Sequence, residues 1–220
     1  MPEPIILFED DTVVVVNKPS GMIVHPDDRH DYPALTHWLE KKYTEHFLVH
    51  RLDRETSGVL MVAKTEAAHA FLKEQFHERE IHKVYRAFVY GVIKDDRGII
   101  DKPIGNARGG RGPRSAMRPH GTTRDALTTF RVIERGTEAT YVEVMPKTGR
   151  THQIRVHFAA IQRAVVCDQL YAPNRPPLLG FARLALHAFS LTFILPSGVE
   201  KTFIAPLPPD FVEAEEKLRI

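Results

Sequence analysis

The chain contains the run His50-Arg51-Leu52-Asp53-Arg54-Glu55-Thr56-Ser57-Gly58, which leads directly into Val59-Leu60-Met61-Val62-Ala63. The first run places the carboxylate of Asp53 among two arginines and two hydroxyl groups. The second run is apolar and typical of β structure, so it predicts a buried strand over residues 58–64. The two together predict a reactive loop held at the end of a buried strand.

The bulk composition is that of a folded protein. The 220 residues are 43% apolar and 26% charged, enough for one large domain or two lobes around a cleft. No apolar run approaches about 20 residues, and the N-terminus has no signal-peptide pattern. The single cysteine, Cys167, excludes an intrachain disulfide and fits a reducing compartment. We therefore expect a cytoplasmic protein with no membrane partner.

Hydrophobic periodicity predicts strands and helices scattered along the whole chain. The predicted strands are 12–17, 58–64, 84–92, 127–133, 140–145, 184–194 and 201–204. The predicted helices are 34–43, 65–75, 151–162 and 210–218. In the second helix Thr65 is the expected N-cap, with Ala68, Phe71 and Leu72 facing inward. This order favours an α+β fold in which two lobes share one sheet.

Positive charge is concentrated in residues 102–124. The whole chain has a net charge of only +2, so a nucleic-acid site must come from local charge. The segment has no acidic residue and these six cations: Lys102, Arg108, Arg111, Arg114, Arg118 and Arg124. Glycines and prolines interleave them, which predicts a long mobile loop or an irregular hairpin. Two interpretations stay open: a solvated insertion without function, or an arm that orders on the phosphates of RNA.

Several kinds of chemistry are disfavoured by spacing. His152 and His157 are five residues apart, which is not the spacing of a helical zinc pair. Neither a glycine-rich phosphate loop nor a G-x-S-x-G elbow is present. The remaining candidate is a carboxylate that works without metal, and Asp53 is the leading one. An arginine would keep such a group ionised, supplied by the same run or by residues 147–155.

Four motifs together resemble the RluA-type pseudouridine synthases, which isomerise uridine to pseudouridine in RNA. The run around Asp53 is similar to their catalytic motif, and Asn17-Lys18-Pro19-Ser20-Gly21 to their N-terminal motif. Residues 83–91 resemble K-x-Y-x-A-x-V-x-G, and residues 147–155 resemble T-G-R-x-H-Q-I/L-R. These motifs occur in the order of the family and span most of the chain.

Two positions depart from the pattern of the family. Cys167 stands where the family often has a glycine, directly before Asp168. Arg163-Ala164 stands where a histidine-proline pair is common. Both departures predict altered packing or RNA contact at this place, with catalysis retained.

The resemblance assigns roles to three central residues. It makes Asp53 the catalytic residue, which attacks the target nucleotide so that uracil detaches, rotates and rejoins through C5. Whether Asp53 attacks the ribose or the base, or assists an elimination, stays open. Tyr85 corresponds to an aromatic residue that stacks on the extruded uracil, and Arg155 to an arginine that pairs with Asp53.

The resemblance also implies that the target nucleotide is flipped out of its stem. Flipping is needed because an enzyme cannot reach a base that stays stacked in the stem. Arg51 corresponds to the residue that fills the gap left by the flipped base. Ile154 is expected to pack against the base from the other side, although core packing is nearly as good an interpretation. Arg150 and Lys147 are weaker candidates for phosphate contact.

The resemblance implies the following organisation. Residues 1–220 form one pseudouridine synthase catalytic domain without an S4 domain, and residues 102–124 form a basic mobile loop within it. The expected fold is a mixed, mostly antiparallel sheet in two lobes with a central RNA-binding cleft. No cofactor or metal is expected, and the expected partner of a monomer is structured RNA, either a 23S rRNA or a tRNA stem-loop. An RNA-binding protein without catalysis is the alternative that an assay must separate.

Overall fold

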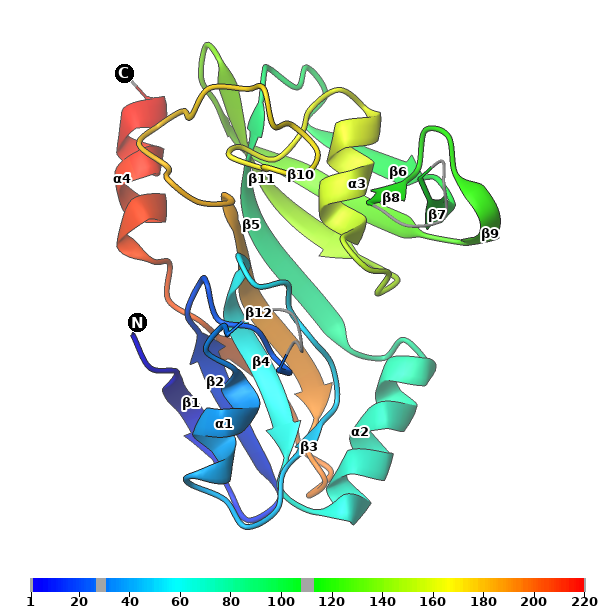
Figure 1. Cartoon of the computed structure of the whole chain (residues 1–220), viewed down its shortest axis with the longest axis vertical. Helices are drawn as coiled ribbons and strands as arrows, with labels where there is room; N and C mark the ends of the chain where they lie inside the picture. The colour runs from blue at the N-terminus through cyan, green and yellow to red at the C-terminus, as the bar shows by residue number, and fades with distance from the viewer. Residues whose placement is uncertain (1, 27–30, 108–112, 220) are drawn as a thin grey trace. The chain divides into compact units, whose positions relative to one another are not determined.

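The computed structural model describes residues 2–26, 31–107 and 113–219. The chain divides into two compact units (Figure 1). Unit 1 contains Met1–Lys83 and His187–Pro206, and unit 2 contains Val84–Leu186 and Leu207–Ile220. Neither unit is therefore a continuous segment of the chain.

Unit 1 is built on a sheet whose central strand is β4. Its strands are β1 (Ile5–Glu9), β2 (Val13–Lys18), β3 (Phe47–Leu48), β4 (Ser57–Ala63), β12 (Leu186–Ile194) and β13 (Glu200–Ile204). One edge of β4 pairs antiparallel with β2, and β1 pairs antiparallel with the outer edge of β2. The other edge of β4 pairs in parallel with β12 near its start and antiparallel with β3 near its end. β13 pairs antiparallel with β12.

The core of unit 1 follows from the apolar character of β2 and β4. Every residue of β4 is buried, as are the four valines of β2. The helices are α1 (Leu35–Glu40), shorter than predicted, and α2 (Glu66–His77), which contacts β3 and β4. Figure 1 shows both helices beside these strands. The predicted strands 12–17 and 58–64 are confirmed within one residue.

One predicted face of α2 is wrong. Thr65 is the N-cap as expected, since its side chain accepts a hydrogen bond of 3.2 Å from the amide of Ala68. Phe71, however, is 40% exposed, and Gln75 takes an inward position. The side-chain amide of Gln75 exchanges two 2.9 Å hydrogen bonds with the backbone of Ile194. Gln75 is therefore buried while Phe71 is exposed, because the Gln75 side chain satisfies the backbone polar groups of Ile194 at the end of β12.

Unit 2 has an antiparallel sheet in the order β5-β11-β10-β6. Its strands are β5 (His82–Tyr90, whose first two residues belong to unit 1), β6 (Arg97–Asp101), β10 (Leu127–Arg135) and β11 (Ala139–Pro146). Its helices are α3 (Gln153–Ala160) and α4 (Pro209–Leu218). The core gathers the rings of Phe88, Tyr141, Phe181 and Phe211 between sheet and helix. The hairpin predicted between residues 127 and 145 is confirmed.

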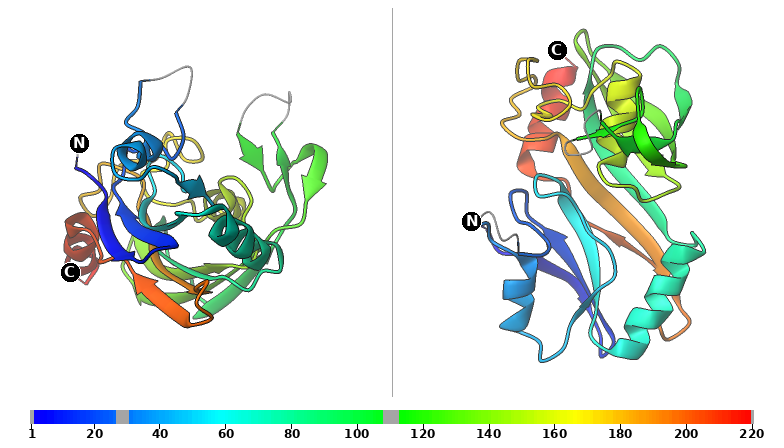
Figure 2. Two further views of the ribbon diagram at one scale, coloured as in Figure 1. Left: turned by 90° about the horizontal axis from the view of Figure 1, so that it is seen from below. Right: turned by 45° about the vertical axis from the view of Figure 1, so that its right-hand side comes forward.

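The basic segment contains a second, small sheet in unit 2. Its strands are β7 (Ile104–Asn106), β8 (Arg114–Ser115) and β9 (His120–Arg124), in the order β8-β7-β9. We call residues 102–124 the basic arm; both views of Figure 2 show its strands in green. Its apolar residues Ile104 and Ala116 pack with Val156 of α3. The described part of the arm is thus a sheet seated on a helix, while Arg108 and Arg111 lie outside the described residues.

The α+β class with a mixed, mostly antiparallel arrangement of strands is confirmed. Among the described residues, no helix combines the length and the apolar character needed to cross a membrane.

Candidate active site

The loop that carries Asp53 is anchored by a buried lysine. Lys18 is fully buried, and its ammonium donates to the carbonyl oxygens of Pro19 at 2.9 Å, Met22 at 2.8 Å and Arg54 at 3.2 Å. Charged donors make stronger hydrogen bonds than neutral ones. Lys18 therefore ties the turn after β2 to the residue that follows Asp53.

Two further hydrogen bonds join the same turn to the Asp53 loop. The amide of Gly21 donates to the carbonyl oxygen of Arg54 at 2.8 Å, and the hydroxyl of Ser20 donates to that of Glu55 at 2.7 Å. The N-terminal motif thus supports the backbone of the catalytic motif. Two motifs that are distant in sequence are thus hydrogen-bonded to one another.

The catalytic motif closes with a turn and a glycine that the fold requires. The amide of Thr56 donates to the carbonyl oxygen of Asp53 at 3.1 Å. Gly58 has φ +117°, and a Cβ atom there would lie 2.1 Å from the carbonyl oxygen of Ala188 on β12. No L side chain fits this place. Gly58 lets β12 approach the end of the loop, which fixes where β4 begins.

Two histidines of unit 1 are structural. The ring of His187 is buried, with Nδ1 2.9 Å from the hydroxyl of Ser57 and Nε2 3.2 Å from the carbonyl oxygen of Ala205. Since a carbonyl oxygen can only accept, Nε2 donates. His50 accepts a 3.0 Å hydrogen bond from the amide of Met61, and burial lowers its pKa to about 3. His50 is therefore a neutral acceptor that fastens the start of the motif to β4.

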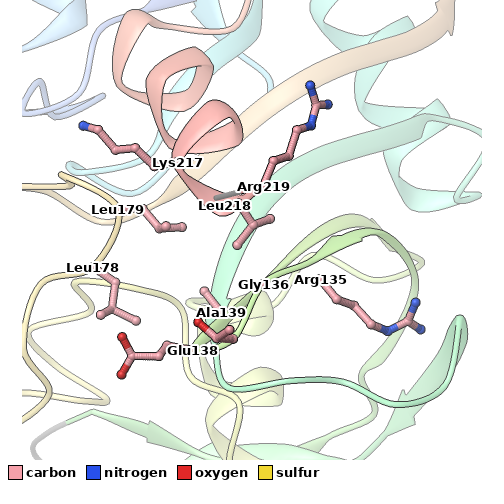
Figure 3. Close-up of a pocket in the computed structure, with 10 residues that line it drawn as sticks. Arg135, Gly136, Glu138, Ala139, Leu178, Leu179, Lys217, Leu218 and Arg219 are labelled. Atoms are coloured by element: carbon pink, nitrogen blue, oxygen red, sulfur yellow. The ribbon is translucent and has the colours of Figure 1, made fainter.

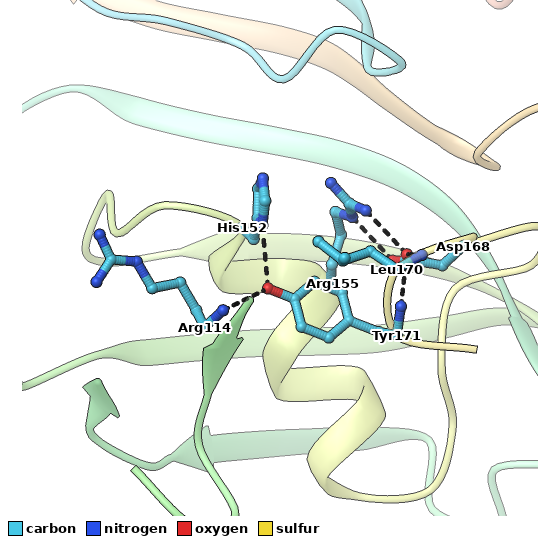
Figure 4. Close-up of polar contacts among 6 residues, drawn as sticks. All are labelled: Arg114, His152, Arg155, Asp168, Leu170 and Tyr171. Carbon is cyan, nitrogen blue, oxygen red and sulfur yellow. Dashed lines mark hydrogen bonds and ion pairs between the residues drawn. The ribbon is translucent and has the colours of Figure 1, made fainter. Parts of the chain in front are cut away.

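In unit 2, Arg155 of α3 is held by Asp168. Nε and Nη2 of Arg155 lie 2.8 Å from the two oxygens of the Asp168 carboxylate, and both side chains are buried (Figure 4). One oxygen of this carboxylate also accepts hydrogen bonds of 3.0 Å from the amides of Leu170 and Tyr171. A bidentate arrangement fixes the plane of the guanidinium group. The sequence did not predict this partner, and the pairing of Arg155 with Asp53 stays a prediction.

Gln153 shapes the loop that precedes Arg155. Its side-chain oxygen accepts hydrogen bonds from the hydroxyl of Thr148 at 2.7 Å and from the amide of Arg150 at 3.0 Å. Its side-chain nitrogen donates to the carbonyl oxygen of Leu127 and the hydroxyl of Thr128, both at 3.0 Å. All the polar atoms of this buried amide side chain are engaged. The third motif is thus fastened to β10 at its glutamine.

The other predicted site residues have different surroundings. Tyr85 is half-buried on β5 and packs against the core of unit 2, while Ile154 is buried within that core. Arg150 donates from Nε to the carbonyl oxygen of Asp125 at 3.1 Å. Arg51, in unit 1, is exposed. The functional roles predicted for these four residues stay predictions.

Cys167 has the backbone conformation of a glycine. Its φ is +58°, in the left-handed region that side chains rarely adopt. Its amide donates to the hydroxyl of Tyr90 at 3.2 Å, and its thiol donates to the carbonyl oxygen of Phe181 at 3.2 Å. Burial raises the pKa of the thiol. The cysteine thus occupies a turn suited to glycine, directly before Asp168.

A cavity of about 500 Å³ lies elsewhere in unit 2 (Figure 3). Residues 135–139 of the β10–β11 hairpin, Leu178, Leu179 and residues 217–219 line it. It contains none of the residues predicted for the site.

One group of side chains among the described residues could hold a metal ion by its spacing. Glu74, His77 and Glu78 lie together at the end of α2. All three are exposed, and Nδ1 of His77 already lies 2.9 Å from the carboxylate of Glu78. Exposed acidic groups of this kind are common on helices, and the group shares no residue with the catalytic motif.

Comparison with known proteins identifies the family. A profile described as RNA pseudouridylate synthase matches residues 12–160. The chain belongs to this family, whose members are isomerases that act on RNA.

Curated relatives match almost the whole chain. It is 40% identical to an uncharacterized RNA pseudouridine synthase, YlyB, of Bacillus subtilis, covering 97% of this chain and 72% of that protein. It is 38% identical to the dual-specificity RNA pseudouridine synthase RluA of Vibrio vulnificus, covering 97% and 86% respectively. It is also 38% identical to the ribosomal large subunit pseudouridine synthase D of Neisseria meningitidis, covering 100% of this chain but 63% of that protein.

Among solved structures, human RNA pseudouridylate synthase domain containing 4 aligns with a TM-score of 0.80 at 28% identity. The alignment covers 97% of this chain and 92% of the human one.

Proposed function

We propose that this protein isomerises specific uridines in rRNA, tRNA or both to pseudouridine, with Asp53 as the nucleophile. Membership of the family supports the class of reaction. The observation that carries the assignment of Asp53 is the anchoring of its loop. Lys18, Ser20 and Gly21 each donate one hydrogen bond to a carbonyl oxygen of Arg54 or Glu55, which directly follow Asp53. Two further hydrogen bonds from the buried Lys18 hold the turn after β2 that carries these donors.

The reaction needs such a fixed carboxylate and no redox step. The bond between N1 of uracil and C1′ of the ribose breaks, and a bond between C5 and C1′ forms. The C5 proton is lost to solvent and N1 gains one, so the product is an isomer of the substrate. A covalent or ion-pair intermediate at Asp53 keeps the cleaved base in place while it turns.

Arg155 and Tyr85 complete the proposed chemistry. Asp168 fixes the plane of the Arg155 guanidinium group, and we propose that this group pairs with Asp53 during the reaction. Tyr85 offers a half-buried ring, and stacking of a base on an aromatic ring contributes about 1–3 kcal/mol. Ile154 adds apolar support from the start of α3.

Binding of RNA is proposed to flip the target uridine. Unstacking costs a few kcal/mol, which contacts to the phosphates offset. Arg51 is exposed and can fill the gap that the base leaves. Arg150, Lys147 and the cations of the basic arm are proposed to contact phosphates.

The substrate is proposed to be a stem-loop of 23S rRNA or tRNA. Relatives of this chain are named for the ribosomal large subunit, which supports rRNA, and for dual specificity, which supports more than one RNA substrate. We further propose that the protein acts as a monomer in the cytoplasm.

Release of tritium tests this function. Unmodified transcripts of large-subunit rRNA and tRNA, labelled with tritium at uridine C5, are incubated with protein in the presence and absence of a chelator. We expect release that the chelator does not change and that Asp53→Asn lowers by at least about 10³-fold. Asp10→Asn is the matched control, since the Asp10 carboxylate caps a turn in unit 1 and should be dispensable for release. Binding without release would support the RNA-binding alternative.

The basic arm is tested by the salt dependence of RNA binding. Neutralising Arg111, Arg114 and Arg118 together should lower the slope of log affinity against log salt by about three, one per lost phosphate contact. A control that neutralises Arg131 and Arg135 of β10, which are paired with Glu143 and Asp96, should change it little. An unchanged slope in the arm variant would show that the arm does not contact RNA.

A further inference from the structure

Tyr171 lies where the basic arm meets α3. Its hydroxyl accepts a hydrogen bond of 3.1 Å from the amide of Arg114, the first residue of β8. The same hydroxyl lies 3.0 Å from Nδ1 of His152, the residue before α3 (Figure 4). One side-chain oxygen thus joins the arm to the third motif.

The rest of Tyr171 supports Arg155. The guanidinium carbon of Arg155 lies 5.3 Å from the centre of the Tyr171 ring, within the range of a cation–π contact. The amide of Tyr171 donates to the carboxylate of Asp168 at 3.0 Å, and that carboxylate grips Arg155. Figure 4 shows the ring between the end of β8 and the Arg155–Asp168 pair. Tyr171 therefore contacts both the basic arm and Arg155.

The strand that Tyr171 holds has few other anchors. β8 is two residues long, and among the described residues it pairs with β7 alone, at Gly105 and Asn106. The side chain of Arg114 bonds to Asn106, which is itself part of the arm. Apart from the small apolar cluster with Val156, the hydroxyl of Tyr171 is the described polar contact that fixes β8 to the rest of unit 2. Loss of this hydroxyl should therefore loosen the arm before it disturbs the core.

We propose that Tyr171 is a positioning residue that couples the seating of the basic arm to the orientation of Arg155. The proposal rests on the proposed function, in which the arm binds RNA and Arg155 serves Asp53. Its hydroxyl holds β8 in place, and its ring and amide hold the guanidinium group. Displacement of the arm, or its seating by RNA, is transmitted to Arg155 through this one side chain.

Two substitutions separate the hydroxyl from the ring. Tyr171→Phe removes the hydroxyl and keeps the ring, so KM for RNA should rise about three- to tenfold while kcat stays within about twofold. Tyr171→Leu also removes the ring, so kcat should fall at least about fivefold in addition. Tyr141→Phe is the matched control, because it removes a tyrosine hydroxyl from the core of the same unit without touching the arm.

Hydrogen exchange measures the hydrogen bond between the Arg114 amide and the Tyr171 hydroxyl directly, with no need for catalytic activity. The amide of residue 114 should exchange at least about tenfold faster in Tyr171→Phe than in the wild type. Arg114→Ala should keep a protected amide, since the bonded group belongs to the backbone, although it removes a cation. Wild-type exchange in Tyr171→Phe would overturn the proposal, as would unfolding of that variant, which would make the hydroxyl a determinant of global stability.

Coupling is measured by combining Tyr171→Phe with Arg118→Ala, which neutralises a cation of the arm. If Tyr171 seats the arm, the rise in KM caused by Arg118→Ala should be smaller in the Tyr171→Phe background than in the wild type. Simple multiplication of the two effects would overturn the coupling. If the wild type releases no tritium from any RNA, the proposed function fails, and the same cycle measured on RNA affinity, with the exchange data, still decides whether Tyr171 seats the arm.

Discussion

Replacing Lys18 with methionine should destabilise unit 1 and displace the loop of Asp53. Methionine has nearly the shape of lysine but no donor, so the carbonyl oxygens of Pro19 and Met22 lose the ammonium that they now accept from. The carbonyl oxygen of Arg54 keeps its hydrogen bond from Gly21.

The magnitude follows from two opposing effects. Leaving a buried acceptor without a donor costs about 1–3 kcal/mol, so two such groups cost about 2–6 kcal/mol. Removing the buried ammonium group offsets part of this free-energy cost, because burial of a charge is itself unfavourable. We expect a net loss of about 2–4 kcal/mol in the free energy of unfolding, and at least a tenfold loss of kcat as the Asp53 loop shifts.

Urea unfolding measures the stability, and tritium release measures kcat. Lys64→Met is the matched control, because Lys64 also donates to a backbone carbonyl, that of Asp10 at 2.7 Å, but its side chain is 21% exposed and lies outside the loop. Its loss should cost no more than about 1 kcal/mol and leave kcat unchanged. Equal behaviour of the two variants would refute the claim that the buried ammonium group organises the site.

Three further outcomes are expected. Gly58→Ala should cost at least about 3 kcal/mol, measured by urea unfolding, because its Cβ would meet a backbone oxygen at 2.1 Å; full stability would contradict the close approach of β12. Stability should fall as the pH drops below about 6.5, by about 2 kcal/mol at pH 5, since the unfolded state binds a proton that the folded state accepts only near pH 3 at His50. His50→Gln should flatten this dependence, and an unchanged profile would assign it to other groups. Asp168→Ala should cost about 3–5 kcal/mol by leaving Arg155 buried without its carboxylate, which thermal unfolding would reveal and which wild-type stability would disprove.

Most of the strands that periodicity predicted are buried on at least one face, although β13, predicted at residues 201–204, is exposed at four of its five residues. β2, β4, β10 and β11 were predicted closely because their apolar residues follow the period of a half-buried or buried strand. The strands of the basic arm were missed because β9 is exposed at all of its five residues, and nothing in an exposed strand alternates. β1 was missed for the same reason, since Ile5 is 63% exposed at a sheet edge.

The candidate site was predictable in its motifs but not in its supports. Resemblance of the motifs to the family singled out Asp53 and Arg155, and their roles stay predictions. The ion pair between Asp168 and Arg155 follows a turn at Cys167 with positive φ, and a cysteine gives no sequence signal for such a turn. The burial of Lys18 could not be inferred either, because lysine is rarely buried and its three acceptors are backbone atoms.

The division of the chain between the two units governs the order in which it can fold on the ribosome. β4 ends at Ala63, but the strand that completes its parallel edge, β12, begins about 120 residues later. Protein synthesis proceeds at about 5–20 residues per second, so this edge of β4 stays unpaired with β12 for several seconds to tens of seconds. During that time the edge of a mostly apolar strand lacks the backbone partner that it has in the folded protein, which exposes the nascent chain to incorrect strand pairing.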